Sequence, residues 1–232
     1  MGKKYIAAVK KVTAASYNMV DGCALLKEVH YAKFDESVDL AMRLGVDPKQ
    51  SDQMVRGSVV LPHGTGKKVR VLVFARGDYE KEAQQAGADY VGLEELIEKI
   101  NGGWLEFDVV VATPDLMGTV GKLGKVLGPR GLMPNPKTGT VTFDIARAMR
   151  EIRQGKAEYR IEKAGIIHVS IGRVSFSATQ LTENASAVLD AVIKSKPSTS
   201  KGKYLKGITL SSTMSPGIPI DTGSLSAEKA AA

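Results

Sequence analysis

The amino-acid sequence predicts an α/β protein of two domains, and three observations support this. The chain has 232 residues, of which 43% are hydrophobic, enough for one large core or two modest ones. Apolar runs are continuous in the middle of the chain and alternate with polar residues at its ends. The net charge of +7 lies at the two ends. We expect a discontinuous α+β domain from residues 1–67 and 159–232, with a three-layer, Rossmann-like α/β domain inserted at 68–158.

The charge is divided unevenly along the chain. Residues 1–67 hold 10 Lys and Arg against 7 Asp and Glu, residues 68–158 hold 13 against 13, and residues 159–232 hold 9 against 5. The middle segment is therefore neutral. This segregation favours a polyanion-binding unit built from both ends of the chain.

Residues 33–45, KFDESVDLAMRLG, alternate strictly and predict a strand with one solvated face. The apolar side consists of Val38, Leu40, Met42 and Leu44. The polar side consists of Asp35, Ser37, Asp39 and Arg43. The same alternation places Phe34 on the core side.

The middle segment has the pattern of a parallel sheet covered on both faces. Short apolar runs at 69–75 and 107–113 predict buried strands, and 88–92 predicts a further one. Between them, 79–87 and 94–102 are rich in helix formers and are each stopped by glycine. Alternation of strands and helices predicts α/β architecture.

The last third returns to one-sided elements. Residues 165–173 and 204–213 predict strands whose outward residues include His168, Ser170 and Ser211. Residues 181–196 predict an amphipathic helix, with Thr182 as a possible cap and Pro197 after its end.

Three long windows lack acidic residues altogether: 53–77, 116–143 and 191–220. The second contains LGPRGLMPNPKTG at 127–139, whose glycines and prolines exclude a regular helix or a central strand. Arg130 and Lys137 are its basic residues. A surface free of carboxylates admits phosphates without repulsion. Solvated loops that lack acids by chance are the alternative.

Enzyme motifs are incomplete. GTGK at 64–67 lacks the first glycine of a P-loop, and Lys68 stands where that motif has Ser or Thr. No dinucleotide-binding glycine pattern follows the strand at 69–75. His30, His63 and His168 lack metal-ligand spacing, and the single Cys23 excludes an internal disulfide. We expect no enzyme activity, no cofactor and no metal.

The sequence also has no run of eighteen apolar residues and no secretory leader pattern at its start. We expect a cytoplasmic protein without a membrane partner.

Several long segments resemble the L1 family of bacterial large-subunit ribosomal proteins. DLMGTVGKLGKVLGPRGLMPNPKTGTV at 115–141 is similar to the most characteristic segment of the family. The resemblance continues in 32–40, 51–75, 86–92, 107–117 and 211–216. It covers nearly the whole chain, from about residue 3 to 225.

The resemblance implies two domains, the second inserted in the first, and binding of a folded stalk of large-subunit ribosomal RNA. It also implies assistance to the release of deacylated tRNA from the exit site, and translational repression through binding to its own mRNA. We expect a monomer outside the ribosome.

Carried over residue by residue, the resemblance assigns RNA contacts to both ends of the chain. The implied residues are Lys33, Phe34, Ser37, Lys163, Ser211, Thr213 and Met214. Ser215 stands where the family usually has glycine, which calls the local backbone geometry into question. Arg130 and Lys137 belong either to a rigid loop or to a secondary phosphate contact.

Two other functions fit parts of the sequence. The inserted segment could bind a phosphate-containing ligand as an enzyme, near Gly128–Gly131 or at the carboxyl ends of its strands. The basic ends could instead bind any polyanion, without regard to RNA fold.

Overall fold

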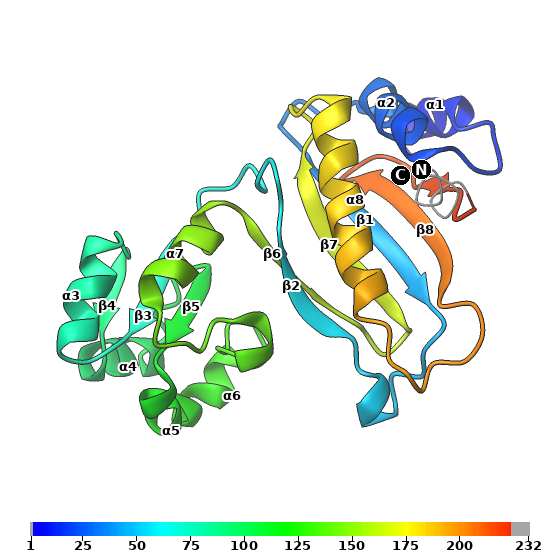
Figure 1. Cartoon of the computed structure of the whole chain (residues 1–232). Coiled ribbons are helices and arrows are strands. Elements are labelled where there is room, and N and C mark those ends of the chain that lie inside the picture. Colours follow the sequence, from blue (N-terminus) through cyan, green and yellow to red (C-terminus); the bar gives the residue numbers. More distant parts are fainter. Residues whose placement is uncertain (1, 224–232) are drawn as a thin grey trace. The chain divides into compact units, whose positions relative to one another are not determined.

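The computed structural model describes residues 2–223 (Figure 1). The chain divides into two compact units. Unit 1 contains the residues up to Gly66 together with those from Ala157 onward, and unit 2 runs from Lys67 to Lys156. The architecture is a mixture of helices and sheets, which confirms the predicted α/β class.

Unit 1 is built on an antiparallel sheet whose strands come from both ends of the chain. Its order is β7-β1-β8-β9, with β7 at Ile166–Arg173, β1 at Ser37–Leu44, β8 at Leu205–Ser212 and β9 at Ile218–Ile220. A second, two-stranded sheet joins β2 (Arg56–Val60) to β6 (Lys156–Arg160). The central strand β1 therefore has both of its neighbours from the far end of the sequence.

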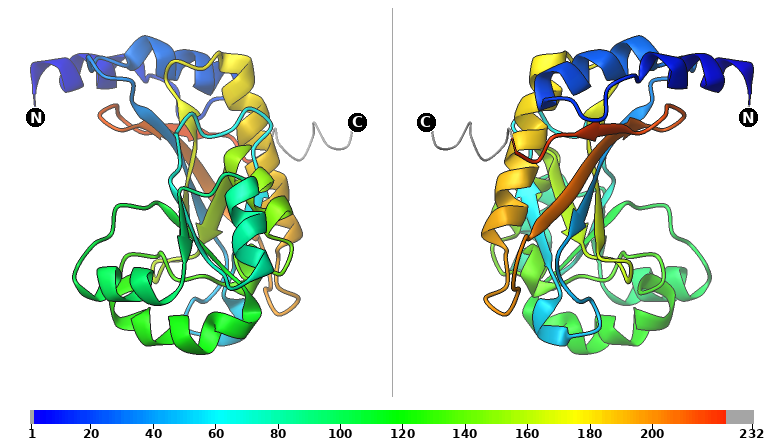
Figure 2. Two further views of the ribbon diagram at one scale, coloured as in Figure 1. Left: turned by 90° about the vertical axis from the view of Figure 1, so that its left-hand side faces the viewer. Right: turned by 90° about the vertical axis from the view of Figure 1, so that its right-hand side faces the viewer.

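Helices α2 (Met19–Val29) and α8 (Ala178–Lys194) share one hydrophobic core with the apolar face of this sheet. The predicted inward residues of β1 are all buried: Val38, Leu40, Met42 and Leu44. Helix α1 (Lys3–Lys11) buries only Ala8 and extends beyond α2 at the edge of the unit (Figure 2). Tertiary contacts of α1 are therefore few.

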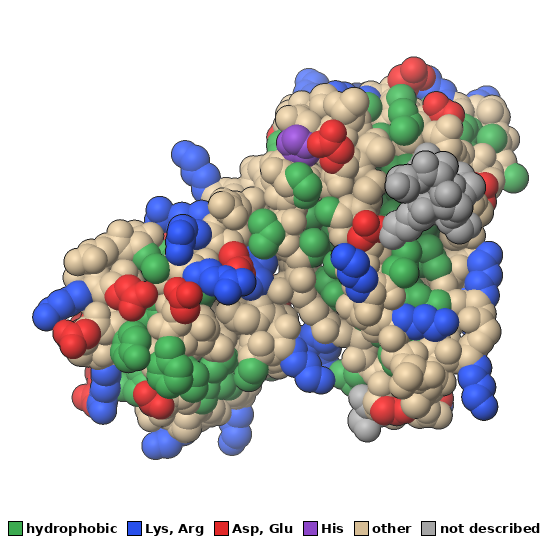
Figure 3. Space-filling model, in the orientation of Figure 1, with side chains coloured by type: hydrophobic (Ala, Val, Ile, Leu, Met, Phe, Trp, Pro, Cys, Tyr) green, Lys and Arg blue, Asp and Glu red, His purple; other side chains and the backbone are tan. Residues whose placement is uncertain are grey.

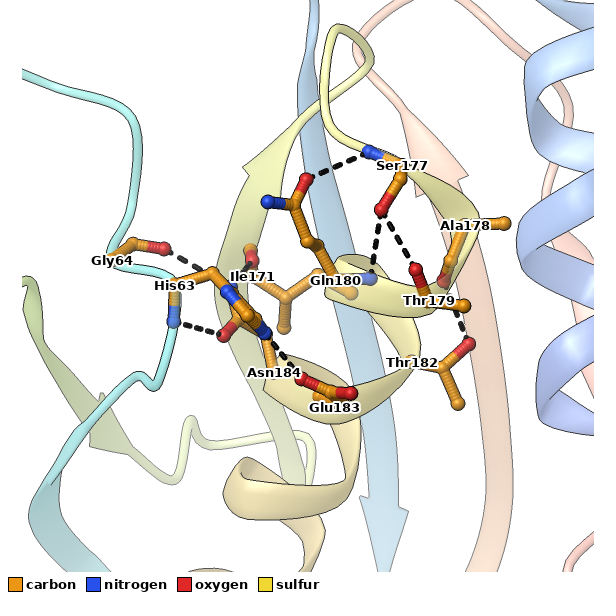
Figure 4. Close-up of polar contacts among 10 residues, drawn as sticks. All are labelled: His63, Gly64, Ile171, Ser177, Ala178, Thr179, Gln180, Thr182, Glu183 and Asn184. Atoms are coloured by element: carbon orange, nitrogen blue, oxygen red, sulfur yellow. Dashed lines mark hydrogen bonds and ion pairs between the residues drawn. The ribbon is translucent and has the colours of Figure 1, made fainter.

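Helix α8 begins earlier than the sequence predicts. Ser177 is its N-cap: the Ser177 hydroxyl accepts from the Gln180 N–H at 3.2 Å, and the Gln180 side chain accepts from the Ser177 N–H at 2.9 Å (Figure 4). This reciprocal pair is a capping box. The prediction that Thr182 caps the helix is wrong. Thr182 lies within α8, and its hydroxyl donates to the Ala178 carbonyl one turn earlier, at 2.8 Å.

Unit 2 is built on a parallel sheet of order β4-β3-β5, with β3 at Val71–Phe74, β4 at Tyr90–Gly92 and β5 at Val109–Ala112. Leu72 and Phe74 join a core with α4 (Glu94–Asn101) and with the short helices α5 (Met117–Val120) and α6 (Gly124–Leu127). Val71 and Val73 join a separate core with α3 (Asp78–Gln85) and α7 (Ile145–Arg153). Strand β3 is thus buried on both faces, as its unbroken apolar sequence predicts.

The segment 127–139 is stiffened by its own hydrogen bonds. The Asn135 N–H donates to the Thr140 hydroxyl at 2.8 Å, and the buried Thr138 hydroxyl donates to the Asn135 carbonyl at 3.1 Å. Gly131 and Gly139 have positive φ angles of 72° and 68°, a conformation that favours glycine. Leu127 is the last residue of α6, and Pro136–Thr138 form a 3₁₀ turn. The other residues of the segment are neither helix nor strand, as predicted.

Candidate nucleic-acid interface

The polar sides of three strands in unit 1 form rows across the sheet. Asp39 of β1 lies opposite Ser170 of β7 on one side and Ser211 of β8 on the other. In the next row, Ala41 lies between His168 and Thr209. We call this surface the open face; its residues are Asp39, Ala41, Arg43, His168, Ser170, Thr209 and Ser211, all partly or fully exposed. It presents three hydroxyl groups around one carboxylate.

Two chain segments form the rim of the open face at the Ser37 end of β1. They are residues 33–37, which lead into β1, and residues 211–215, in which β8 ends at Ser212. The Thr213 N–H donates to the Ser37 carbonyl at 3.1 Å, so the two segments lie side by side. Six of the sequence-predicted contact residues belong to this rim: Lys33, Phe34, Ser37, Ser211, Thr213 and Met214. The structure therefore brings these six residues to one end of the open face.

The predicted burial of Phe34 is wrong, since 53% of this side chain is exposed. The alternation rule fails here because β1 begins only at Ser37, so Phe34 lies outside the pleated strand. Met214, on the other segment of the rim, is 48% exposed. The rim therefore carries two large apolar side chains in contact with solvent.

The acidic residues of the rim are bound to the protein itself. The Asp35 carboxylate accepts from the N–H and the hydroxyl of Ser175, at 3.0 and 2.9 Å. The backbone carbonyl of Asp35 accepts from Arg173 Nη1 at 2.9 Å. Glu36 is completely buried and accepts hydrogen bonds from the Ser212 hydroxyl and, at 3.4 Å, from the Met214 N–H. Both carboxylates therefore hold neighbouring loops in place.

Ser215 occupies the position where the resemblance predicts glycine. Its φ angle is not positive, because no non-glycine residue among those described has a positive φ. Its hydroxyl accepts from the Ser212 N–H at 2.8 Å and donates to the Pro216 carbonyl at 3.2 Å. In this chain the turn therefore needs no glycine at this position, and the serine closes it with side-chain hydrogen bonds.

The remaining predicted residues lie elsewhere. Lys163 is exposed in the connection before β7, at the end of the open face away from Ser37, because Ile166 pairs with Arg43. Arg130 and Lys137 belong to unit 2 and are exposed there. Lys137 lies in the 3₁₀ turn, where its N–H donates to the Asn135 side chain at 2.8 Å.

Sequence reasoning did not select Asp39 as a contact residue, although the alternation of residues 33–45 places it on the solvated side. A carboxylate repels phosphates, so the sequence alone gives no reason to place Asp39 on a surface that binds them. Its position between Ser170 and Ser211 makes it a hydrogen-bond acceptor at the centre of the open face. A row of alternating donors and acceptors can select polar groups of a ligand rather than charge alone.

The opposite side of unit 1, where α8 lies, has a different character. Figure 3 shows its lysine and arginine side chains spread singly over the visible surface rather than gathered in one patch. Within residues 2–223, no group of three or more His, Cys, Asp or Glu side chains could hold a metal ion. Nor is any helix in this range both long enough and apolar enough to cross a membrane.

A comparison with protein-family models matches residues 26–216 of the chain to the Ribosomal protein L1p/L10e family. The matched range includes β1, β7 and β8, all of unit 2 and the whole rim. The family consists of structural RNA-binding proteins of the large ribosomal subunit rather than of enzymes. With more than half of its length matched, this chain belongs to the Ribosomal protein L1p/L10e family.

Proposed function

We propose that unit 1 is the RNA-binding domain and that its open face and rim recognise a folded stalk of large-subunit ribosomal RNA. Unit 2 is then an inserted, Rossmann-like α/β domain. The observation that carries this proposal is the row Ser170–Asp39–Ser211, which presents hydroxyls and a carboxylate at the spacing of neighbouring strands. Such groups match ribose 2′-hydroxyls and base edges, which distinguish one RNA shape from another.

Recognition divides among the residues by their chemistry. Ser211, Thr213 and Asp39 exchange hydrogen bonds with 2′-hydroxyls and base edges, and Lys33 binds a phosphate. Phe34 and Met214 pack against sugars and bases, which explains their exposure in the free protein. Ser37 supports the rim, and Lys163 meets the RNA backbone farther along the face.

Finer properties of the chain are also proposed, most of them from the resemblance to the family. The chain assists the release of deacylated tRNA from the exit site of the ribosome. It binds a similar RNA element in its own mRNA and represses translation. It is a monomer outside the ribosome, and Arg130 and Lys137 supply either a rigid loop or a secondary phosphate contact in unit 2.

The test begins by finding the RNA. The chain is bound to total large-subunit ribosomal RNA, and the fragment that it protects from nuclease is isolated; we call this the protected fragment. Thr213→Val should then weaken binding to the protected fragment by about 1–3 kcal/mol, because a polar group of the RNA loses its partner in a desolvated contact.

A matched variant in unit 2, Thr119→Val, should leave this affinity unchanged. A second probe, a fully paired RNA duplex of the same length, separates selective from nonspecific binding at fixed salt. Equal affinity for the two RNAs would identify a general polyanion binder instead of a reader of RNA shape.

A further inference from the structure

The turn that carries Thr213 and Met214 is fixed by two hydrogen bonds from other segments to the backbone of Met214. The Met214 N–H donates to Glu36 Oε2 at 3.4 Å, and the Met214 carbonyl accepts from the Tyr31 hydroxyl at 2.7 Å. Both backbone polar groups of Met214 therefore have side-chain partners, while its own side chain stays 48% exposed.

Neighbouring residues of the turn are restrained in the same way. The Thr213 N–H donates to the Ser37 carbonyl at 3.1 Å. The Ser215 N–H donates to the Ser212 carbonyl at 3.2 Å, and the Ser212 N–H donates to the Ser215 hydroxyl at 2.8 Å. Consecutive N–H groups from Ser212 to Ser215 are thus all bonded to protein, so none of them is available to RNA.

Glu36 is an unusual residue for this place. Its side chain is completely buried, and its Oε1 atom has no hydrogen-bond partner within the described part of the chain. Burial of a carboxylate costs stability, and an apolar side chain would fill the space at lower cost. The two hydrogen bonds that the Glu36 carboxylate does accept, from the Ser212 hydroxyl and the Met214 N–H, both lead to the turn.

We propose that Glu36 and Tyr31 are positioning residues that fix the Thr213–Met214 turn before RNA arrives. This inference rests on the proposed RNA-binding function of the rim. A loop that is ordered in the free protein loses less conformational entropy on binding than a mobile one. Glu36 and Tyr31 then contribute to selectivity without touching the RNA.

The sharpest test is Tyr31→Phe, which removes one hydroxyl and leaves the ring in place. Affinity for the protected fragment should fall about fivefold, the effect of one net hydrogen bond, whereas affinity for the paired duplex should not change. Amide hydrogen exchange in the free protein should become faster at Met214 and Ser215, because the turn opens more often.

Tyr204→Phe is the matched control. The Tyr204 hydroxyl also donates to a backbone carbonyl, that of Val192 at 3.1 Å, but it lies in the core of unit 1. This variant should change neither RNA affinity nor exchange at residues 213–215. A general loss of stability would affect both variants alike, so the comparison isolates the turn.

Glu36 is tested by two substitutions. Glu36→Gln keeps an oxygen that accepts from Met214 and Ser212, and it should retain most of the affinity and the slow exchange. Glu36→Leu lacks that acceptor and should lose about tenfold in affinity or more for the protected fragment. Because Glu36→Leu could fail to fold, the decision rests on Tyr31→Phe and Glu36→Gln.

The outcomes separate this inference from the proposed function. If Thr213→Val weakens binding while Tyr31→Phe changes neither affinity nor exchange, the positioning role is refuted and the RNA site stands. Faster exchange at the turn with unchanged affinity would also refute it. If neither Thr213→Val nor Tyr31→Phe affects binding, both proposals fail.

Discussion

Asn184 is a buried residue on α8 that holds the chain where it leaves unit 1. Its side-chain oxygen accepts from the His63 N–H at 3.0 Å, and its amide nitrogen donates to the carbonyls of Gly64 and Ile171, at 3.0 and 2.7 Å (Figure 4). The side chain is completely buried. One amide therefore satisfies three backbone groups on two separate segments.

Replacement of Asn184 by leucine should destabilise unit 1 by at least about 2 kcal/mol, because three backbone groups lose their partner at a site without solvent. Urea unfolding at constant temperature measures this change. Glu183→Gln, at the residue before Asn184, is the control. The exposed Glu183 carboxylate pairs with His63, and loss of this ion pair should cost less than about 1 kcal/mol. Equal effects of the two variants would contradict this account.

Tyr204 couples the stability of unit 1 to alkaline pH. Burial, with a smaller effect of nearby Tyr159, raises the pKa of Tyr204 from 10.0 to about 12. The folded chain thus holds the phenol proton more tightly than the unfolded chain. The resulting stabilisation is complete below pH 10 and is lost as the pH rises from about 10 to about 12.

Between these limits the native protein should lose roughly 2 kcal/mol more stability than Tyr204→Phe, which has no proton to release. Urea unfolding of both proteins at several pH values measures the difference. Ultraviolet titration of phenolate absorbance follows the ionisation itself. Parallel pH profiles for the two proteins would show that Tyr204 ionises normally.

Sequence reasoning at the residue scale succeeded where a residue lies inside a regular strand. Ser211 and Asp39 are on the solvated side because β1 and β8 are pleated at these positions. It failed at Phe34, which lies three residues before β1, where the two-residue alternation of a strand does not apply. It also could not foresee that Glu36 and Tyr31 meet Met214, since such contacts depend on segments that are distant in sequence.

At the scale of elements, the helical run of α5, the 3₁₀ turn Gly121–Leu123 and α6 is unusual in its glycines. Its buried residues, Val120, Leu123 and Leu127, follow one face, as does the buried Leu116 just before the run. On the other face, a Cβ added at Gly118, Gly121 or Gly124 would meet nothing within 4 Å. Packing against residues 2–223 therefore does not require glycine at these three positions.

Gly121→Ala should therefore stabilise unit 2 by about 0.5–1 kcal/mol, because Gly121 has helical angles of −57° and −29° and alanine loses less backbone entropy on folding. Gly128→Ala is the contrasting variant, since its Cβ would lie 2.5 Å from the Gly124 carbonyl oxygen. It should destabilise unit 2 instead. Urea unfolding of both variants checks the opposite signs.

The strands and helices predicted from periodicity agree with the structure within a few residues at their ends. The strand expected at 69–75 is β3 at Val71–Phe74, and the helix expected at 94–102 is α4 at Glu94–Asn101. Strong periodicity in buried segments accounts for this agreement. By contrast, β2 and β6 were not predicted. No residue of β2 is fully buried, so this strand has no apolar face for the sequence to reveal, and the short β6 buries only Ala157 and Tyr159.

At the scale of the molecule, the excess charge should act through the salt dependence of RNA binding. Lys203 is exposed, and its amine donates only to the Thr222 hydroxyl, at 3.2 Å, among the contacts that the structure describes for it. Lys203→Ala should weaken binding to the protected fragment and to the duplex alike. It should also reduce the slope of log affinity against log salt by at most about one.

Lys81→Ala, at an exposed site on α3 in unit 2, is the control for loss of one charge. Its effect on affinity should be smaller at every salt concentration, because Lys81 lies beside the Asp78 carboxylate and belongs to neither the open face nor its rim. A loss restricted to the protected fragment in Lys203→Ala would instead make Lys203 a selective contact. Filter binding over a range of salt concentrations distinguishes these results.

The meeting of both chain ends in one sheet has a consequence during synthesis. Strand β1 leaves the ribosome early, but its partners β7 and β8 are made only after all of unit 2. At typical elongation rates, β1 waits on the order of ten seconds with both edges unpaired, while the contiguous unit 2 can already fold. Unpaired edges invite aggregation, so the nascent chain should depend on chaperones most strongly in this interval.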